Sequence, residues 1–422
     1  MNKRFRSILL YFILFGAMFL FGFIQNIRGV TYPLIKTEFN TSYEQQGMMV
    51  SLLGIGYVIF CLVGGILLGR FGVKKALISG FILLIAGITA VFYMPSFWTL
   101  AGSLFIVFAG FGMFEVGSNA LAAQLFTTRT ALMMSLLHFF FGAGAALSPR
   151  AAGVISAGIG WRYVYILSIP LVLVFLIPTL FAKFPSSAAA AETAATAPQE
   201  KTPRKPETKK LSFFFALKTP MVWLFASCLG LMVILEMCTP NWSGLYFQDV
   251  YNLDPTTSGA AFVSNFFIFF TVSRLVTGFV IEKTGYIRSL FISLFISIAI
   301  LSTGFILGAR GIYILPLLGF FVAVFWPTLL ATAMVYFRKD APVMTSAIIV
   351  ISGTIVSFLN FLIGLVNRLA GPAWGYRSCL VYAVIIIIIL AAITKRLKTP
   401  YNSGATGNAA GTTAGTAAGT AG

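Results

Sequence analysis

The chain has 422 residues, of which 59% are hydrophobic and only 9% are charged. A soluble globular protein carries about 25% charged residues, so this chain does not face water over most of its surface. The formal net charge is +18, but no soluble basic face accompanies it, which argues against a nucleic-acid-binding protein.

Apolar runs long enough to cross a membrane recur along the chain. Runs of about 18 or more apolar residues are typical of membrane-spanning helices. The first run follows a short basic start and lacks a small-residue cleavage site, so we interpret it as an anchor rather than a signal peptide. We predict twelve spans, at residues 7–32, 45–69, 76–94, 97–124, 131–156, 162–182, 213–240, 257–281, 287–308, 311–337, 341–368 and 374–396.

The basic residues lie mostly on one side of these spans. With the N-terminus inside, the segments on that side hold 21 of the 29 Lys and Arg residues, which follows the positive-inside rule. We therefore expect a monomeric, multi-pass protein of the cytoplasmic membrane with both termini in the cytoplasm. Its partners are then the lipid bilayer and a small-molecule substrate.

Polar residues interrupt the first and fourth spans. Gln25 and Arg28 share one helical face, as do Glu115 and Asn119. A charge in mid-membrane costs at least about 2.5–3.5 kcal/mol, so such a residue usually faces a cavity. Glu115 can carry a proton between the two sides, with Asn119 as a substrate ligand. The alternatives are that Glu115 pairs with Arg28, and that Arg28 is an interfacial or gating charge.

The turns after the second and eighth spans are alike. Each has a glycine-bearing helix end, a polar turn and then basic residues, at the same place in its half of the chain. Two six-span halves with matching turns are typical of an internally duplicated transporter. Aligning Gly65 with Gly278 pairs Gly69 with Glu282, Arg70 with Lys283 and Gly72 with Gly285.

The first of these turns resembles the major facilitator signature G-x-x-x-D-R-x-G-R-[RK]-[RK], with Gly69 in place of the aspartate. In that superfamily the aspartate helps to latch the two halves on the cytoplasmic side. The resemblance covers residues 7–396 and implies an all-α membrane protein of twelve transmembrane helices in two pseudo-symmetric six-helix bundles. These bundles rock around a central site. It also implies a group of conformational-switch residues: Gly65, Gly69, Arg70, Gly72, Glu282 and the structural arginine Arg274.

The fourth and fifth spans resemble those of the fucose–proton symporter family and its glucose-transporting relatives. There a glutamate of helix 4 precedes an asparagine by four residues, and helix 5 carries a polar residue before F-x-x-G-x-G/A. The resemblance implies that Glu115 is the proton-coupling acid, Asn119 a substrate ligand and His138 a cavity-lining residue; otherwise His138 is a packing residue. Arg28 and Gly29 stand where the fucose symporter has an aspartate, and a cation there also suits a substrate carboxylate.

A polar segment divides the chain in two. Residues 183–212 are rich in Ala, Pro, Thr and Lys and have no apolar period, so we interpret them as a cytoplasmic linker. They separate an N-terminal six-helix bundle at 1–182 from a C-terminal bundle at 213–396. Residues 397–422 are of low complexity and predict a disordered cytoplasmic tail.

The second half offers further polar candidates. Glu236, deep in the seventh span, is a second proton-coupling candidate. Pro240 is expected to break or kink that helix and so expose Asn241 and Trp242 to substrate; the alternative is a helix end with an interfacial tryptophan. Trp326 in the tenth span and Asn360 in the eleventh are candidate ligands or packing residues.

No pattern for covalent chemistry is present. The four cysteines lie in apolar spans without metal-ligand spacing and are interpreted as inert thiols. No Ser-His-Asp, zinc or phosphate-loop pattern occurs. We therefore expect no enzyme activity, no cofactor and no metal.

The sequence favours a secondary active transporter that carries out proton-coupled symport of a small polar organic solute, with sugar first, by alternating access. Sodium is an alternative coupling ion, because Glu115, Asn119 and Glu236 offer oxygen ligands. A second hypothesis is a proton-coupled drug or metabolite exporter, because residues 144–153 approach the antiporter signature G-x-x-x-G-P-x-x-G-G. A third is a proton-coupled transporter of organic anions such as monocarboxylates, with Arg28 or Arg274 as the anion clamp.

Overall fold

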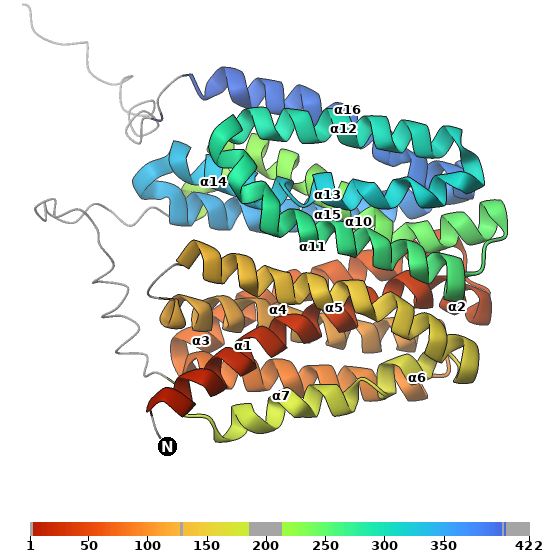
Figure 1. Cartoon of the computed structure of the whole chain (residues 1–422), viewed down its shortest axis with the longest axis horizontal. Helices are drawn as coiled ribbons and strands as arrows, with labels where there is room; N and C mark the ends of the chain where they lie inside the picture. Colours follow the sequence, from red (N-terminus) through yellow and green to blue (C-terminus); the bar gives the residue numbers. More distant parts are fainter. Residues whose placement is uncertain (1–2, 127–129, 185–212, 399–400, 402–422) are drawn as a thin grey trace, which may run out of the picture.

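A computed structural model describes residues 3–126, 130–184, 213–398 and 401 of the chain (Figure 1). Most of the predicted linker and tail lies outside these residues. The predictions for those two segments, and for the domain boundaries, therefore remain predictions.

The first half of the chain folds into long apolar helices. A bilayer offers the backbone no hydrogen bonds, so spans must satisfy their N–H and C=O groups internally. In chain order the helices are α1 (Lys3–Asn26), α2 (Arg28–Phe39), α3 (Tyr43–Tyr93), α4 (Phe97–Leu125), α5 (Thr130–Ile159), α6 (Trp161–Ile166) and α7 (Ile169–Phe181).

The second half repeats this plan. Its tenth predicted span is not one helix, because 3-10 segments and short helices share its length. In chain order the elements are α9 (Phe213–Leu217), α10 (Pro220–Tyr251), the π-helical turn η1 (Pro255–Gly259), α11 (Ala260–Thr284), α12 (Tyr286–Ile306), the 3-10 segments η2 (Gly308–Tyr313) and η3 (Leu315–Leu317), α13 (Leu318–Val322), α14 (Phe325–Phe337), η4 (Arg338–Asp340), α15 (Ala341–Ala370) and α16 (Pro372–Arg396).

Ten segments of the described chain are long and apolar enough to cross a membrane. One of them, α3, turns at Gly72, where φ is 80° and ψ is 172°. Its two parts pack along α4 in opposite directions, so α3 supplies the second and third predicted spans. The helix α5, with 30 residues, fits the fifth. The protein is thus an all-α membrane protein whose helices accommodate the twelve predicted crossings.

The two halves turn at corresponding positions. The predicted pairing of Gly72 with Gly285 is matched by the backbone, since φ is 80° at the first and 83° at the second. Glycine adopts such angles without strain, and asparagine tolerates positive φ better than most residues. Three pairs of residues with positive φ recur 211 to 213 positions apart in the described chain: Asn40 and Asn252, Gly72 and Gly285, and Gly160 and Gly371.

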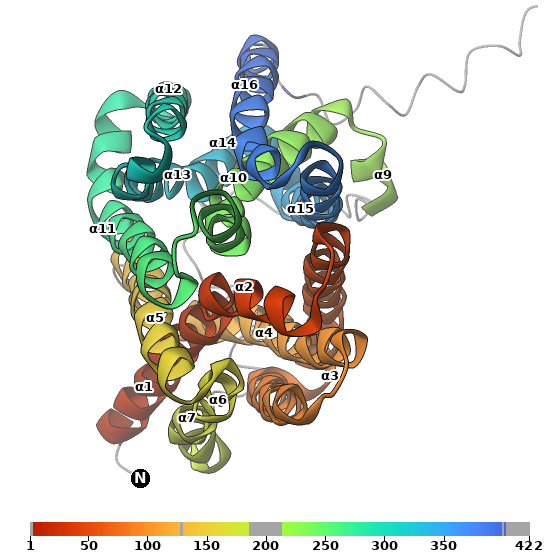
Figure 2. The same cartoon turned by 90° about the vertical axis from the view of Figure 1, so that its right-hand side faces the viewer.

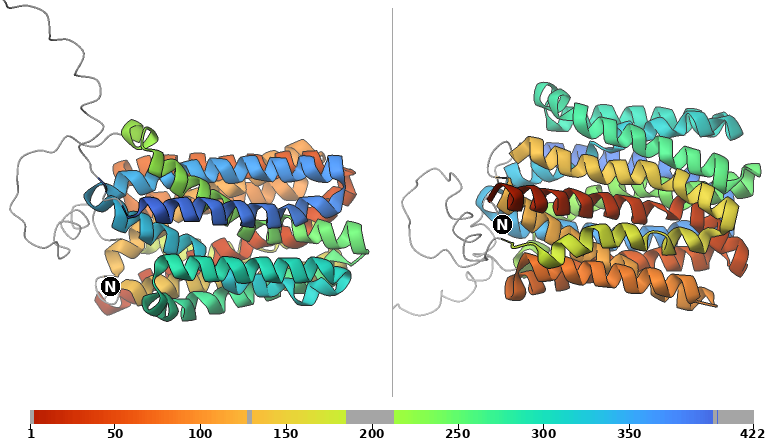
Figure 3. Two further views of the ribbon diagram at one scale, coloured as in Figure 1. Left: turned by 90° about the horizontal axis from the view of Figure 1, so that it is seen from above. Right: turned by 60° about the horizontal axis from the view of Figure 1, so that its bottom comes forward.

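The helices form two bundles that lie side by side, α1 to α7 in one and α10 to α16 in the other (Figures 1 and 3). Each bundle has its own buried apolar core. Phe181 ends α7 and Phe213 begins α9 at one end of the molecule, which we call the linker end; the opposite end is the far end. Large apolar side chains such as Ile306 (84% exposed) and Phe279 (73%) lie on the outside, as expected of a lipid-facing surface.

In the described chain, most of the contact between the bundles is made by α2 with α10, α3 with α15, and α5 with α11 (Figure 2). Small residues allow these backbones to approach closely. A Cβ atom on Gly244 of α10 would lie 2.6 Å from the carbonyl oxygen of Gly29 in α2. A larger residue at Gly244 would therefore force the bundles apart.

Charged side chains join the bundles at the far end. Asp249 of α10 accepts a hydrogen bond from the Tyr43 hydroxyl over 2.6 Å and pairs with the Lys36 ammonium over 3.3 Å. Arg368 of α15 forms an ion pair with Glu44 of α3. The structure therefore represents a state in which the bundles are held together at the far end.

At the linker end, the glycines before the two matching turns are not packed against the other bundle. A Cβ atom built on Gly65, Gly69 or Gly278 would meet no heavy atom within 4 Å. The tight contacts that Gly47 and Gly54 of α3 make with α15 of the other bundle thus have no counterpart at Gly65 or Gly69. This asymmetry between the two ends is what alternating access requires of one of its states.

Candidate transport site

Four ionisable side chains gather where the bundles meet at mid-depth. Arg28 comes from α2, His138 from α5, Glu236 from α10 and Arg274 from α11. Glu236 interacts electrostatically with both arginines, and His138 with Arg274. Two helices of each bundle therefore contribute to one cluster, which we call the arginine–glutamate cluster.

The Arg28 guanidinium is enclosed by aromatic and polarizable groups. It is 5% exposed, its Nη2 lies 3.2 Å from the Met237 sulfur, and its centre lies 5.7 Å from the centroid of the Phe108 ring. The phenols of Tyr32 and Tyr165 lie beside it. Arg28 is therefore buried inside the protein and does not reach outward to the membrane interface, so the interfacial alternative is wrong for this structure.

The charges of the cluster do not balance. Arg274 lies over the Phe270 ring, 4.9 Å from its centroid, and Glu236 is 9% exposed. Among the described residues no ion pair within 4 Å includes Glu236, and the Nε atoms of both arginines are buried without a hydrogen-bond partner. A buried cation, Arg28, and a half-buried one, Arg274, thus share one carboxylate at a distance. A buried charge without a close partner is costly, so the cluster favours a second anion.

Glu115 and Asn119 form a separate pair on α4. The Asn119 side-chain amide donates a hydrogen bond to the Glu115 carboxylate over 2.8 Å, as expected of residues one turn apart on one face. Asn119 is exposed and Glu115 half-buried. Tyr57 and Cys61 of α3 lie close enough to Glu115 for electrostatic interaction. Within the described chain Glu115 forms no ion pair with Arg28, so that alternative is wrong for this state.

The two polar groups lie at different depths. Phe108, which packs on Arg28, precedes Glu115 by seven residues on the same helix. At 1.5 Å per residue this places Glu115 about 10 Å nearer the linker end. A solute entering from that end would meet Asn119 before it reached the arginines.

Asn241, Trp242 and Asn360 join α10 to α15. The Asn360 Oδ1 atom accepts hydrogen bonds from the Asn241 amide and the Trp242 indole, each over 3.1 Å. Trp242 is 1% exposed, so the interfacial alternative is wrong. These contacts favour the packing role, with only the Asn241 Oδ1 atom left without a partner.

Of the break or kink expected at Pro240, the break does not occur. α10 continues through Pro240 to Tyr251, eleven residues beyond the predicted end of the seventh span. The polar residues that follow Pro240 read as a helix end in the sequence, but they are buried against α15 and the N-terminal bundle. Glu236 and Asp249 therefore lie on one continuous helix.

The remaining candidates lie around the cluster or near it along the chain. Gln25 is half-buried one turn before Arg28, and the helical φ and ψ of Ile27 keep the two helices nearly continuous. Trp326 is half-buried at the start of α14. The predicted switch residues are dispersed: Gly65, Gly69, Arg70, Gly72 and Glu282 lie at the linker end, whereas Arg274 lies in the central cluster.

Sequence reasoning missed several neighbours of these groups. Tyr32 lies one helical turn after Arg28, a spacing that could have indicated it. Tyr57, Cys61 and Tyr165 approach from other helices, and the register between helices is not readable from a single sequence.

Comparison with known proteins identifies the chain. A family model described as Major Facilitator Superfamily matches residues 14–360. This chain belongs to the major facilitator superfamily. It is therefore a membrane transporter and not an enzyme, as predicted.

The proteins that this chain resembles include a hexuronate transporter and a fucose:proton symporter. It is 24% identical to a TsgA homolog of Buchnera aphidicola subsp. Schizaphis graminum, over 86% of this chain and 89% of that one. It is also 24% identical to the hexuronate transporter of Bacillus subtilis, over 64% of each chain. Among solved structures, the fucose:proton symporter FucP of E. coli has a TM-score of 0.62 and 17% identity, covering 92% of this chain and 99% of that chain. At this identity the likeness shows the shared fold.

Proposed function

We propose that this transporter carries out proton-coupled symport of a small organic anion, with sugar acids as the first class to test. One observation carries the proposal: a buried arginine of one bundle, Arg28, and a half-buried arginine of the other, Arg274, share a single carboxylate with which neither forms an ion pair within 4 Å. Arginine binds carboxylates with two parallel hydrogen bonds. The likeness to a hexuronate transporter supports the same solute class.

The mechanism follows from competition for the arginines. An anion that binds Arg28 and Arg274 leaves Glu236 as a buried carboxylate without a counter-charge. Such a group is costly to hold in a low-dielectric interior, and a proton removes the cost. Solute and proton therefore bind together, and the bundles swing between the two access states when both are present or both are absent.

Glu115 and Asn119 then act on the uncharged part of the solute. Their hydrogen-bonded pair offers an amide and a carboxylate oxygen toward the linker end, groups that suit hydroxyls. The same pair supports a second candidate, symport of a neutral sugar, with Glu115 as the coupling acid.

The orientation of the chain is part of the proposal. Exposed basic residues such as Lys75, Arg288 and Lys395 lie at the linker end, which supports a cytoplasmic linker end by the positive-inside rule. The bacterial cytoplasmic membrane is then the site of action, and the described state faces the cytoplasm. A cationic-drug exporter is disfavoured because its substrate would meet the two arginines of the central cluster.

The test is proton movement in proteoliposomes that enclose a pH-sensitive dye. We expect glucuronate outside the vesicles to acidify the lumen, and fucose or a hydrophobic cation to do so far less. Acidification by fucose alone would select the neutral-sugar candidate. Efflux of protons driven by hydrophobic cations would contradict both and favour the exporter.

A further inference from the structure

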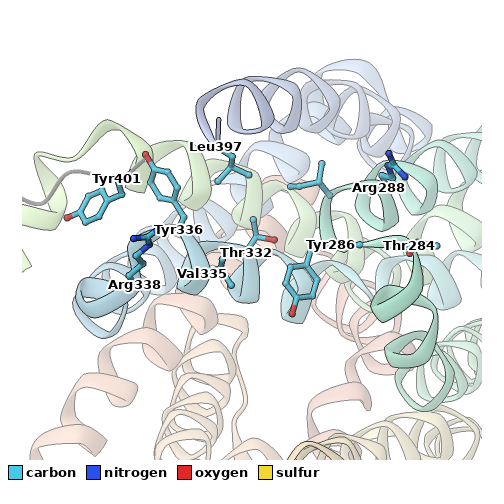
Figure 4. Close-up of a pocket in the computed structure, with 11 residues that line it drawn as sticks. Thr284, Tyr286, Arg288, Thr332, Val335, Tyr336, Arg338, Leu397 and Tyr401 are labelled. Carbon is cyan, nitrogen blue, oxygen red and sulfur yellow. The ribbon is translucent and has the colours of Figure 1, made fainter. Parts of the chain in front are cut away.

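A pocket of about 520 Å³ lies at the linker end of the C-terminal bundle, away from the central cluster (Figure 4). It forms where the turn between α11 and α12 meets the end of α14 and the residues that follow α16. Its lining includes two arginines, three tyrosines and two threonines, among them Tyr286, Arg288, Thr332, Tyr336, Arg338 and Tyr401.

The pocket is cationic at both ends. Arg288 and Arg338 come from different elements and lie at opposite ends of the pocket, with Tyr286, Thr332 and Val335 between them (Figure 4). Both arginine side chains are exposed, and neither forms an ion pair within 4 Å among the described residues. Arg338 also holds a φ of 51°, a backbone conformation that side-chain-bearing residues rarely adopt.

Tyr401 closes one wall of the pocket. Its ring centroid lies 5.7 Å from that of Tyr336 and 5.2 Å from that of Phe337. Burial and the neighbouring Asp340 carboxyl raise the pKa of the Tyr401 phenol to about 12. The phenol is therefore neutral at physiological pH and adds no negative charge beside the arginines.

Exposed apolar side chains lie along the α14 side of the pocket and beside it. Val335 is 66% exposed, and Met334 (51%) and Tyr286 (43%) are also open. A free phosphate ion would leave this surface uncovered, whereas a lipid places its headgroup at the helix ends and its acyl chains along the apolar helices. Basic pockets between transmembrane helices on the cytoplasmic side suit anionic lipid headgroups.

We infer that this pocket binds the phosphodiester headgroup of an anionic phospholipid, with Arg338 and Arg288 as the cationic ligands and Val335 against the first part of an acyl chain. The lipid would join the α11–α12 turn to the end of α14. The inference does not depend on which solute the central cluster carries.

Native mass spectrometry of the purified, delipidated full-length protein tests this inference. The protein is titrated with phosphatidylglycerol, with phosphatidylcholine of the same acyl chains, and separately with inorganic phosphate. We expect phosphatidylglycerol to bind more tightly than phosphatidylcholine. Arg338→Gln and Arg288→Gln should each weaken one phosphatidylglycerol site about fivefold. A matched control is Arg310→Gln, which removes an exposed arginine at the far end of the same bundle and should leave that site unchanged.

Three results would overturn the inference. Equal binding of the two lipids would remove the role of charge. Unchanged phosphatidylglycerol binding in both pocket variants would place the lipid elsewhere. Full displacement of phosphatidylglycerol by millimolar phosphate would assign the pocket to a soluble phosphate ligand. Thermal unfolding of each variant, measured in parallel, separates lost binding from lost folding, because both arginines are exposed and their replacement should leave the unfolding temperature unchanged.

Discussion

The two bundles share their turns but differ in the chemistry that they bring to the centre. Asn40, Gly72 and Gly160 have counterparts with the same unusual backbone 211 to 213 residues later. The deep acids have no such counterparts. Glu115 of the N-terminal bundle is held by an amide of its own helix, whereas Glu236 of the C-terminal bundle lies in the field of arginines from both bundles.

This difference distinguishes the residues that maintain the duplicated fold from the residues that we propose to bind solute and proton. A turn that requires positive φ constrains its residue in each copy, so the duplicated scaffold is still visible. The charged residues at the centre are constrained by the solute instead, so their positions need not be repeated in the two halves. Glu236 is therefore expected to respond to movement between the bundles, while Glu115 moves with its own bundle.

The largest expected effect is that of Glu236→Gln on coupling. Without a titratable group between the arginines, the solute no longer requires a proton. We expect accumulation driven by a proton gradient to fall to the equilibrium ratio, while exchange of labelled solute across the membrane continues. Labelled glucuronate uptake and counterflow in the same vesicles measure both. Loss of exchange together with accumulation would mean that Glu236 is needed for binding or folding instead.

The next largest effect is that of the arginines on affinity. Removing one member of a buried charge cluster costs about 2–5 kcal/mol, so Arg28→Gln and Arg274→Gln should each raise the Kd for glucuronate about 100-fold. Calorimetry or a thermal-shift titration measures this. Arg150→Gln is the matched control, because Arg150 also joins the bundles, through a 3.0 Å hydrogen bond to Asn265, but lies outside the cluster. An equal loss in the control would contradict a specific anion site.

A smaller effect is expected from Glu115→Gln. Hydrogen bonds to charged groups contribute about 1.5–3 kcal/mol, so binding of hydroxylated anions should weaken about tenfold while coupling is retained. Binding of an unhydroxylated carboxylate of similar length should change little. If Glu115→Gln abolished proton movement and Glu236→Gln did not, the roles of the two acids would be reversed.

The smallest effect is expected at the far end. The ion pair of Glu44 with Arg368 is partly exposed, with 57% of the arginine side chain accessible, and such pairs contribute about 0–1 kcal/mol. Glu44→Gln should therefore raise thiol labelling of a far-end cysteine by at most about fivefold. Glu38→Gln, which breaks a 2.8 Å pair with Arg162 inside one bundle, should not change labelling. A change of similar size in both variants would mean that the pair does not hold the bundles together.

Much of the fold was predictable from the sequence because span length and apolar content are local properties. The pairing of Glu115 with Asn119 was predictable for the same reason, since it depends only on helical spacing. The alignment of Gly72 with Gly285 also agrees with the structure.

The centre of the molecule was less predictable. Asn241 and Trp242 looked like a helix end because their polarity was visible and their burial against α15 was not. The gathering of Arg28, Arg274 and Glu236 depends on the register of three helices from two bundles, which a single sequence does not contain. Arg274 was accordingly assigned to the switch, with the anion clamp as an alternative, and it lies in the central cluster.

Proton uptake on solute binding tests the central claim most directly, because it needs no transport. Purified protein in weakly buffered detergent is mixed with glucuronate in the presence of a pH indicator. The account predicts about one proton taken up per solute bound, no uptake in Glu236→Gln, and uptake retained in Glu115→Gln. Uptake that persists in Glu236→Gln and disappears in Glu115→Gln would contradict it.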